Sequence, residues 1–297
     1  MNKIKESFLI QDLELLSGVK AHTIRIWEKR YDLLNPVRLN RNIRKYDLED
    51  LQKLLNVSVL YSEGYKISKV AKLSEEELFQ EARNVGLKSV VDGFHLKSLV
   101  MAMYAFDKKS FEKIYTVLIN EIGFEKLFIE IYIPLLKYIG VLWQTNAIRP
   151  AHEHFISSLI IEKIVLNTSL VKQKNVNEDK IYILFLPEEE MHGIGLLFLN
   201  YCLKVRNQNT LYLGGSIPLS DLEVLNEKFE SIHWVCSFVI DKTDEKKNAF
   251  IGGLSRFLEG SENQCSIIGS VWSGFEMDEA SKSKINFYSG FKDFPMP

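Results

Sequence analysis

The chain has 297 residues, of which 46% are hydrophobic and 26% charged, and this composition excludes an intrinsically disordered protein. The net charge of −2 hides an asymmetry, because residues 1–74 carry 14 Lys and Arg against 9 Asp and Glu. The longest apolar runs are interrupted by charges and prolines, and the first residues lack a signal-peptide pattern. We therefore expect a cytoplasmic protein with no membrane contact and a basic N-terminal part.

Three segments follow one another, and each has its own hydrophobic period. Residues 1–75 predict short helices with tight connections, and residues 76–175 predict a bundle of about four helices. Residues 176–297 alternate short strand-like runs with helix-length segments, which predicts a parallel sheet covered by helices. The fold class is therefore multidomain, α and α/β, with about five strands. The strand-like runs are 180–186, 210–215, 233–239, 265–269 and 284–289.

The positive charge of the first segment lies on and after one predicted helix, which follows a turn at Gly18. Such a helix can enter the major groove of DNA while neighbouring arginines reach phosphates, although a basic face is also typical of an ordinary solvated surface. Trp27 continues the apolar stripe of this helix, so we interpret it as a core residue. His22 is interpreted as a surface histidine.

The stretch 8–54 resembles the winged helix-turn-helix of the MerR family of transcriptional regulators. The resemblance rests on the glycine turn, a helix with the pattern T-x-R-x-W-E-x-R, and a later R-x-Y, which here are Gly18, Thr23, Arg25, Trp27, Glu28, Arg30, Arg44 and Tyr46. It implies that residues 1–75 bind double-stranded operator DNA, usually as a dimer. The DNA contacts that it implies come from Thr23, Arg25, Lys29 and Arg30 of the recognition helix and from Arg41 and Arg44 of the wing.

A second motif comes directly after the most apolar strand-like run. Glu190, His192 and Gly195 form E-x-H-x-x-G at a strand-to-helix turn, 41 residues separate Gly195 from Ser237, and 29 residues separate Val239 from Gly269. Taken alone, the first motif is also typical of a helix start with carboxylates favoured by the helix dipole. Ligands of open parallel sheets bind outside the carboxyl ends of the strands, where this histidine is expected.

These three parts, in this order, resemble the cobalamin-binding Rossmann-like domain of methionine synthase and the mutases, in which the motif is D-x-H-x-x-G followed by S-x-L and G-G. The resemblance implies that His192 is the lower ligand of the cobalt of cobalamin and that Glu190 hydrogen-bonds its ring. It also implies that Gly195, Ser237 and Gly269 surround the dimethylbenzimidazole tail. The sequence departs from the pattern in having Glu190 for Asp, Val239 for Leu and Ser270 for Gly.

The helical segment carries a third motif, in which Trp143 is followed after nine residues by Glu153 and His154. A buried core tryptophan and a polar helix start would explain each residue alone. Together they resemble the cap of the light-sensing, cobalamin-dependent repressors of the MerR family, which implies that they contact the upper face of the corrin. Those light sensors carry a histidine after the tryptophan, and this chain has Gln144, with His152 nearby.

The three resemblances together imply a transcriptional regulator, and not an enzyme. We expect a repressor controlled by adenosylcobalamin or methylcobalamin, which binds between the cap of residues 76–175 and the Rossmann-like domain of residues 176–297, and a homo-oligomer, dimer or tetramer. One alternative is a ligand-free regulator that uses a degenerate pocket for protein contacts. The other is a corrinoid subunit of a methyltransferase or mutase system, which would leave the basic N-terminal segment without a purpose.

Overall fold

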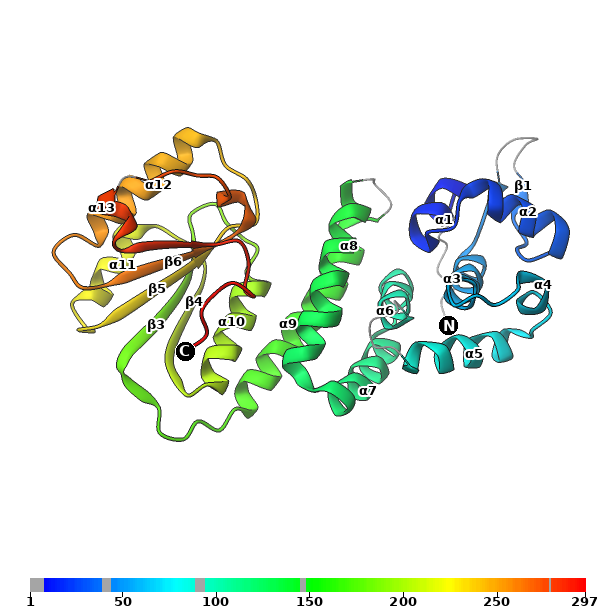
Figure 1. Ribbon diagram of the computed structural model, residues 1–297, viewed down its shortest axis with the longest axis horizontal. Helices are drawn as coiled ribbons and strands as arrows, with labels where there is room; N and C mark the ends of the chain where they lie inside the picture. Colours follow the sequence, from blue (N-terminus) through cyan, green and yellow to red (C-terminus); the bar gives the residue numbers. More distant parts are fainter. Residues whose placement is uncertain (1–7, 39–43, 89–93, 145–147, 278) are drawn as a thin grey trace. The chain divides into compact units, whose positions relative to one another are not determined.

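The computed structural model describes residues 8–38, 44–88, 94–144, 148–277 and 279–297, and the chain divides into two compact units, Met1–Ile156 and Ser157–Pro297 (Figure 1). The first unit contains α1 (Ile10–Ser17), α2 (Ala21–Tyr31), β1 (Val37–Arg38), β2 (Arg44–Lys45), α3 (Leu48–Ser62), α4 (Ile67–Val70), α5 (Glu75–Lys88), α6 (Phe94–Tyr104), α7 (Lys108–Leu127), the π-helix η1 (Phe128–Tyr132), α8 (Ile133–Gln144) and the start of α9 (Pro150–Leu170). The second unit contains the rest of α9, β3 (Asn177–Pro187), α10 (Ile194–Val205), β4 (Gln208–Ile217), α11 (Leu219–Asn226), β5 (Ile232–Ser237), α12 (Asp244–Phe257), β6 (Gln264–Ile268), the 3-10 helix η2 (Ser270–Trp272), α13 (Glu279–Lys282) and β7 (Ile285–Tyr288).

The first two helices form the predicted helix-turn-helix. Gly18 ends α1 with a left-handed φ of 74°, and its N–H donates to the carbonyl of Glu14, which is a helix C-cap that favours glycine. Trp27 of α2 is 4% exposed, and its ring meets that of Tyr61 with centroids 4.9 Å apart. The interpretation of Trp27 as a core residue is therefore confirmed.

The helical segment differs from the sequence prediction at one point. The sequence predicts one long helix over 123–143. Gly123, with φ 75° and ψ 165°, lies at the start of this stretch, but the π-helix η1 interrupts the stretch before α8. Pro134 has no N–H to donate to the carbonyl four residues before it, so regular α-helical hydrogen bonding cannot continue through the start of α8. A π-helical turn absorbs such an interruption.

The second unit is built on one parallel sheet with strand order β4-β3-β5-β6-β7 (Figure 1). All five predicted strands are present, and the predicted fold class is confirmed. The first strand of the sheet, β3, is flanked by the second, β4, and the third, β5, so the strand order reverses at the gap between β3 and β5. Open α/β sheets bind ligands outside the carboxyl ends of the strands at such a point.

Each face of the sheet has its own apolar core. Trp234, Cys236 and Ile267 pack on one face with residues of α11 and α12. On the other face, Val235 and Ile268 pack with leucines of α10 and with Phe294 of the chain segment after β7. Figure 1 shows this last segment running beside α10. A short segment therefore covers a part of this face of the sheet.

The three cysteines, Cys202, Cys236 and Cys265, are buried free thiols. Within the described ranges, no helix has both the length and the apolarity that a membrane crossing requires.

His233 makes the second unit sensitive to acid. It lies under Phe294, its Nε2 is 2.8 Å from the hydroxyl of Ser266, and burial, together with the charge of Lys180, lowers its pKa from 6.5 to about 4. Since the unfolded chain binds the proton more tightly, this neutral histidine contributes stability above pH 6.5. We expect about 3 kcal/mol of unfolding free energy to be lost as the pH falls through 4.

Urea unfolding near neutral pH and near pH 4 measures this loss. The control is His233→Gln, which cannot take up the proton and should lose correspondingly less stability over the same interval. Equal losses in the two proteins would show that His233 does not carry the acid sensitivity.

Candidate functional site

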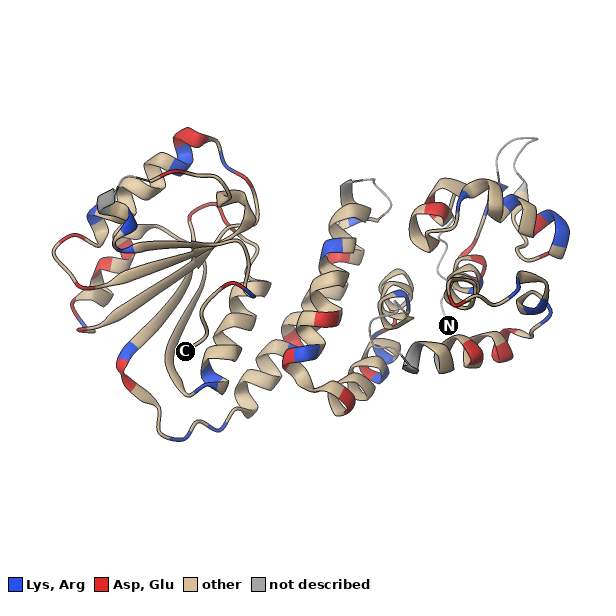
Figure 2. Ribbon diagram, viewed as in Figure 1, with Lys and Arg blue, Asp and Glu red and all other residues tan. Residues whose placement is uncertain are grey.

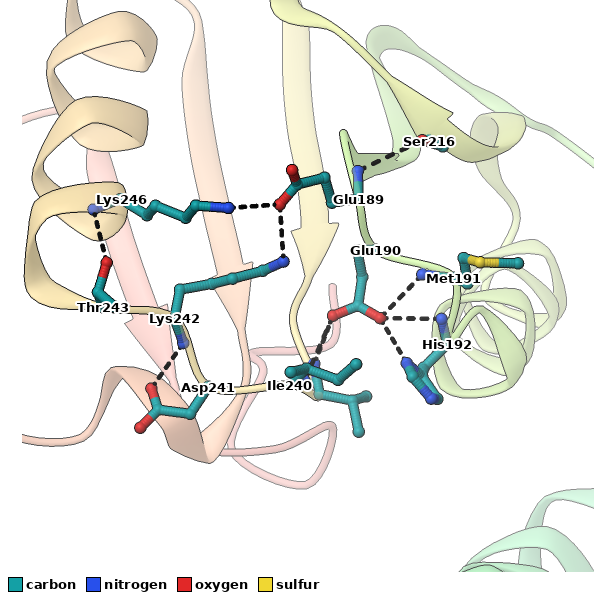
Figure 3. A network of polar contacts seen from close by, with 11 residues as sticks. Glu189, Glu190, Met191, His192, Ser216, Ile240, Asp241, Lys242, Thr243 and Lys246 are labelled. Atoms are coloured by element: carbon teal, nitrogen blue, oxygen red, sulfur yellow. Dashed lines mark hydrogen bonds and ion pairs between the residues drawn. The ribbon is translucent and has the colours of Figure 1, made fainter.

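A buried carboxylate organises the turn after β3 (Figure 3). Glu190 is fully buried, and its Oε1 accepts hydrogen bonds from the backbone N–H groups of Met191 and His192, both at 2.9 Å. Its Oε2 accepts from the N–H groups of Val239, at 3.0 Å, and Ile240, at 3.4 Å. Burial raises the pKa of the Glu190 carboxyl, but these hydrogen bonds outweigh it and hold that pKa below its ordinary value. The carboxylate thereby ties together the loops that follow β3 and β5.

The same carboxylate orients the ring of His192. Its Oε1 lies 2.6 Å from Nδ1 of His192, and the His192 side chain is 51% exposed. With Nδ1 donating to a carboxylate, Nε2 carries the lone pair of the neutral ring, and this is the arrangement that prepares an imidazole to bind a metal. The extra methylene of Glu190, relative to the Asp of the resembled pattern, does not prevent this contact.

Three apolar side chains near this histidine are exposed to solvent. Met191 is 83% exposed, Val239 58% and Ile240 49%. Figure 3 shows Met191 and Ile240 beside His192. Exposed apolar groups beside a polar ring nitrogen suit a broad, largely apolar ligand that carries a metal.

The other residues of the resembled pattern lie close to this turn. Ser237 ends β5, two residues before Val239, and its Oγ is buried with no hydrogen-bond partner among the described residues. Gly269 has φ 159°, and a Cβ there would lie 2.2 Å from the carbonyl oxygen of Phe238, so no larger residue fits. Ser270 is exposed and opens η2, so its hydroxymethyl group does not fill the interior.

Sequence reasoning missed the role of Glu189. This residue has a left-handed φ of 66°, and its carboxylate accepts from Nζ of Lys246 at 2.9 Å and of Lys242 at 3.3 Å (Figure 3). A non-glycine residue with positive φ is uncommon and persists where its surroundings hold it. The lysines after β5 thus hold the turn that presents His192. The run of three acidic residues before His192 was the only signal in the sequence.

Within the first unit, the cap motif lies at both ends of the α8–α9 connection. Trp143 is one residue from the end of α8 and is 50% exposed, and Glu153 lies in the first turn of α9. Nδ1 of His154 lies 3.3 Å from the Glu153 carboxylate, and the His154 side chain is 77% exposed. These side chains are therefore accessible to solvent, so the alternative of a buried core tryptophan does not hold for Trp143. The Gln144 side chain lies outside the described atoms.

His152 belongs to the core of the bundle. It is 3% exposed, its Nδ1 accepts from the N–H of Arg149 at 3.0 Å, and its ring stacks on Phe106 with centroids 4.8 Å apart. A ring held in this way does not take the place of the histidine that the resembled light sensors carry after the tryptophan.

The expected DNA-binding residues gather on α2 and the wing. Arg25, Lys29 and Arg30 are exposed along α2, and Figure 2 shows the basic colour on this helix. Thr23 is half-buried, and its hydroxyl lies 3.3 Å from Nε2 of the exposed His22. Arg41, expected to act from the wing, lies outside the described residues.

Arg44 has a structural contact that the sequence did not reveal. Its Nε donates to Oε1 of Glu28 at 3.0 Å, and the hydroxyl of the buried Tyr46 donates to Oε2 of the same carboxylate, also at 3.0 Å. Burial and the neighbouring carboxylate raise the pKa of Tyr46, so it stays a donor. Glu28 therefore attaches the strand that carries Arg44 to the recognition helix.

Glu28→Ala is expected to lower the unfolding free energy of the N-terminal domain by about 1–3 kcal/mol, because the buried Tyr46 hydroxyl loses its acceptor and Arg44 loses its partner. Thermal unfolding measures the change, and Glu63→Ala, at an exposed position at the end of α3, is the control. Equal stabilities of the two variants would contradict the proposed attachment of the wing.

Comparison with protein families defines the class of protein. Residues 8–77 match the model of the MerR HTH family regulatory protein, and residues 96–165 match the model of a B12 binding domain. These matches give the chain a MerR-type helix-turn-helix segment followed by a B12-binding segment, which is the combination of a DNA-binding regulator controlled by cobalamin.

Among curated proteins, the chain is 28% identical over 213 residues to the HTH-type transcriptional repressor CarH of Myxococcus xanthus, with 70% of each protein covered. Among solved structures, it is similar to a cobalamin-binding protein of Desulfitobacterium hafniense (12% identity, TM-score 0.32, 67% of this chain and 94% of that chain). It is also similar to the monomethylamine corrinoid protein of Methanosarcina barkeri (14% identity, TM-score 0.34, 70% and 82%). TM-scores this low do not establish a shared overall arrangement.

Proposed function

We propose that the protein is a repressor that binds operator DNA as a dimer or tetramer, and that cobalamin bound through Nε2 of His192 changes this assembly. The observation that supports the proposal most is the contact between buried Glu190 and half-exposed His192, which fixes the ring with its lone pair outward. Bound cobalamin would supply a cobalt ion, and His192 would be its protein ligand. Ser237, Gly195 and Gly269 are proposed to accommodate the ligand's tail, and Trp143, Glu153 and His154 its upper side.

The proposed regulation by cobalamin depends on a difference between its affinities for two assemblies of the protein. A ligand shifts an equilibrium between assemblies only if it binds one of them better than the other. A dimer on two-fold symmetric half-sites requires a fixed spacing of its DNA-binding domains. We propose that cobalamin favours the assembly that provides this spacing.

Gel-shift titration with and without adenosylcobalamin or methylcobalamin tests the proposal. The DNA would be duplexes selected from a random pool by the cobalamin-free protein and, in parallel, by the cobalamin-loaded protein. We expect operator affinity to change at least about fivefold with ligand, as for a typical coupling between sites, and the change to be lost in His192→Ala. DNA binding that is identical with and without cobalamin, in a protein that binds cobalamin, would contradict the proposed control.

The same proposal predicts a change in size. Sedimentation of the protein with and without cobalamin, in the dark, should reveal different oligomers, and His192→Ala should sediment alike in both conditions. A monomer in every condition would exclude the oligomeric repressor.

A further inference from the structure

The segment after β7 covers the sheet face that carries Ser237. Side chains alternate along a strand, so Ser237 lies on the same face as Val235 of β5, and Val235 packs with Phe294. Phe294 is 4% exposed, and its ring contacts those of His233 and Tyr288. Residues 289–297, here called the C-terminal segment, are thus packed into the domain on the His192 side of the sheet.

Within this segment, Phe291 lies directly against Gly195. A Cβ built on Gly195 would lie 2.3 Å from ring carbons of Phe291, whereas ordinary van der Waals contacts are above 3.4 Å. Gly195 is in the first turn of α10, three residues after His192. An aromatic ring of the chain itself therefore occupies the space that the absence of a side chain at position 195 creates.

The benzimidazole base of cobalamin is a second group that needs a space of this kind. If His192 takes the position on cobalt that the ligand's own benzimidazole base holds, the base must leave the metal. The arm that carries the base is attached on that same side of the corrin, so the base must be accommodated in the unit that carries His192. Ser237 has a buried hydroxyl without a partner, and a hydroxyl can donate to a ring nitrogen.

We propose that the C-terminal segment is an internal competitor of cobalamin, with the ring of Phe291 in the space that the benzimidazole base takes. Cobalamin binds through His192 by expelling the segment, and a corrinoid without the base binds without expelling it. Phe291 is thus a residue that determines specificity between corrinoids. The inference rests on the proposed binding of cobalamin through His192.

The first test compares two corrinoids and three proteins by absorption titration. Phe291→Ala should raise the affinity for hydroxocobalamin about tenfold, because the competing state is depleted. It should leave the affinity for diaquocobinamide, which lacks the nucleotide that carries the base, unchanged. Phe229→Ala, a half-buried phenylalanine that packs on the opposite face, is the matched control and should alter neither affinity.

The second test needs no variant. Lys292 is exposed beside Phe291, so trypsin cleavage after Lys292, followed by mass spectrometry, reports release of the segment. Hydroxocobalamin should accelerate this cleavage several-fold, and diaquocobinamide should not.

The outcomes separate the two proposals. Binding of both corrinoids with Lys292 equally protected, or equal affinities of Phe291→Ala and the wild type for hydroxocobalamin, would overturn the competition and leave cobalamin binding intact. Failure of both corrinoids to bind would overturn both.

Discussion

His192→Ala is expected to lower the affinity for hydroxocobalamin by at least about tenfold to a hundredfold, because even partners of metal ligands contribute that much. Any cobalamin that remains bound should show the absorption spectrum of cobalamin ligated by its own base. The physical reason is the geometry of the turn: Glu190 holds Nδ1, and Nε2 is the nitrogen left to meet the metal.

Absorption titration of the wild type, His192→Ala and a control measures this effect. The control is His22→Ala, an exposed histidine of the first unit, which should bind cobalamin as the wild type does. The affinity of Glu190→Gln for cobalamin should lie between those of the wild type and His192→Ala, since an amide cannot accept all the hydrogen bonds that the carboxylate receives. Unchanged affinity and spectrum in His192→Ala would mean that this ring does not coordinate cobalt.

The second large effect is expected on the recognition helix. Arg25→Ala should weaken operator binding by about 1–3 kcal/mol and relax the preference for one base pair, if its guanidinium reads a base edge. Lys29→Ala should weaken binding to all sequences alike. It should also reduce the slope of log affinity against log salt concentration by about one, as loss of a phosphate contact does. Both side chains are exposed on α2 and available for such contacts.

Fluorescence anisotropy on selected DNA at several salt concentrations distinguishes the two roles. Lys228→Ala, at an exposed position of the second unit, is the control for a simple change of net charge. If Arg25→Ala and Lys29→Ala bind DNA like this control, α2 is not the recognition helix.

Much of the fold could be predicted because local chemistry determines it. The turn at Gly18 needs a left-handed residue, Trp27 continues an apolar stripe, and the five β-rich runs are separated by helix-length segments. The π-helical turn before α8 was missed, because Pro134 signals that regular hydrogen bonding is interrupted but does not determine the form that the interruption takes.

Only a part of the candidate site could likewise be predicted from the sequence. The spacing of the motifs brought Glu190, His192 and Ser237 together, and the structure places all three at the carboxyl ends of β3 and β5. The pairing of Arg44 with Glu28 and the contact of Phe291 with Gly195 are tertiary. Neither is visible in the sequence, since no periodicity or spacing relates residues that meet only after folding.

The most direct test of cobalt ligation by His192 is the electron paramagnetic resonance spectrum of the reduced, paramagnetic cobalamin in protein labelled with nitrogen-15 only at histidine. Coupling to an axial nitrogen-15 splits each cobalt line in two, whereas the unlabelled nitrogen of the ligand's own base splits it in three. Two-fold splitting that disappears in His192→Ala is the predicted result. Three-fold splitting in the wild type would show that the base stays on the metal and would contradict the proposed site.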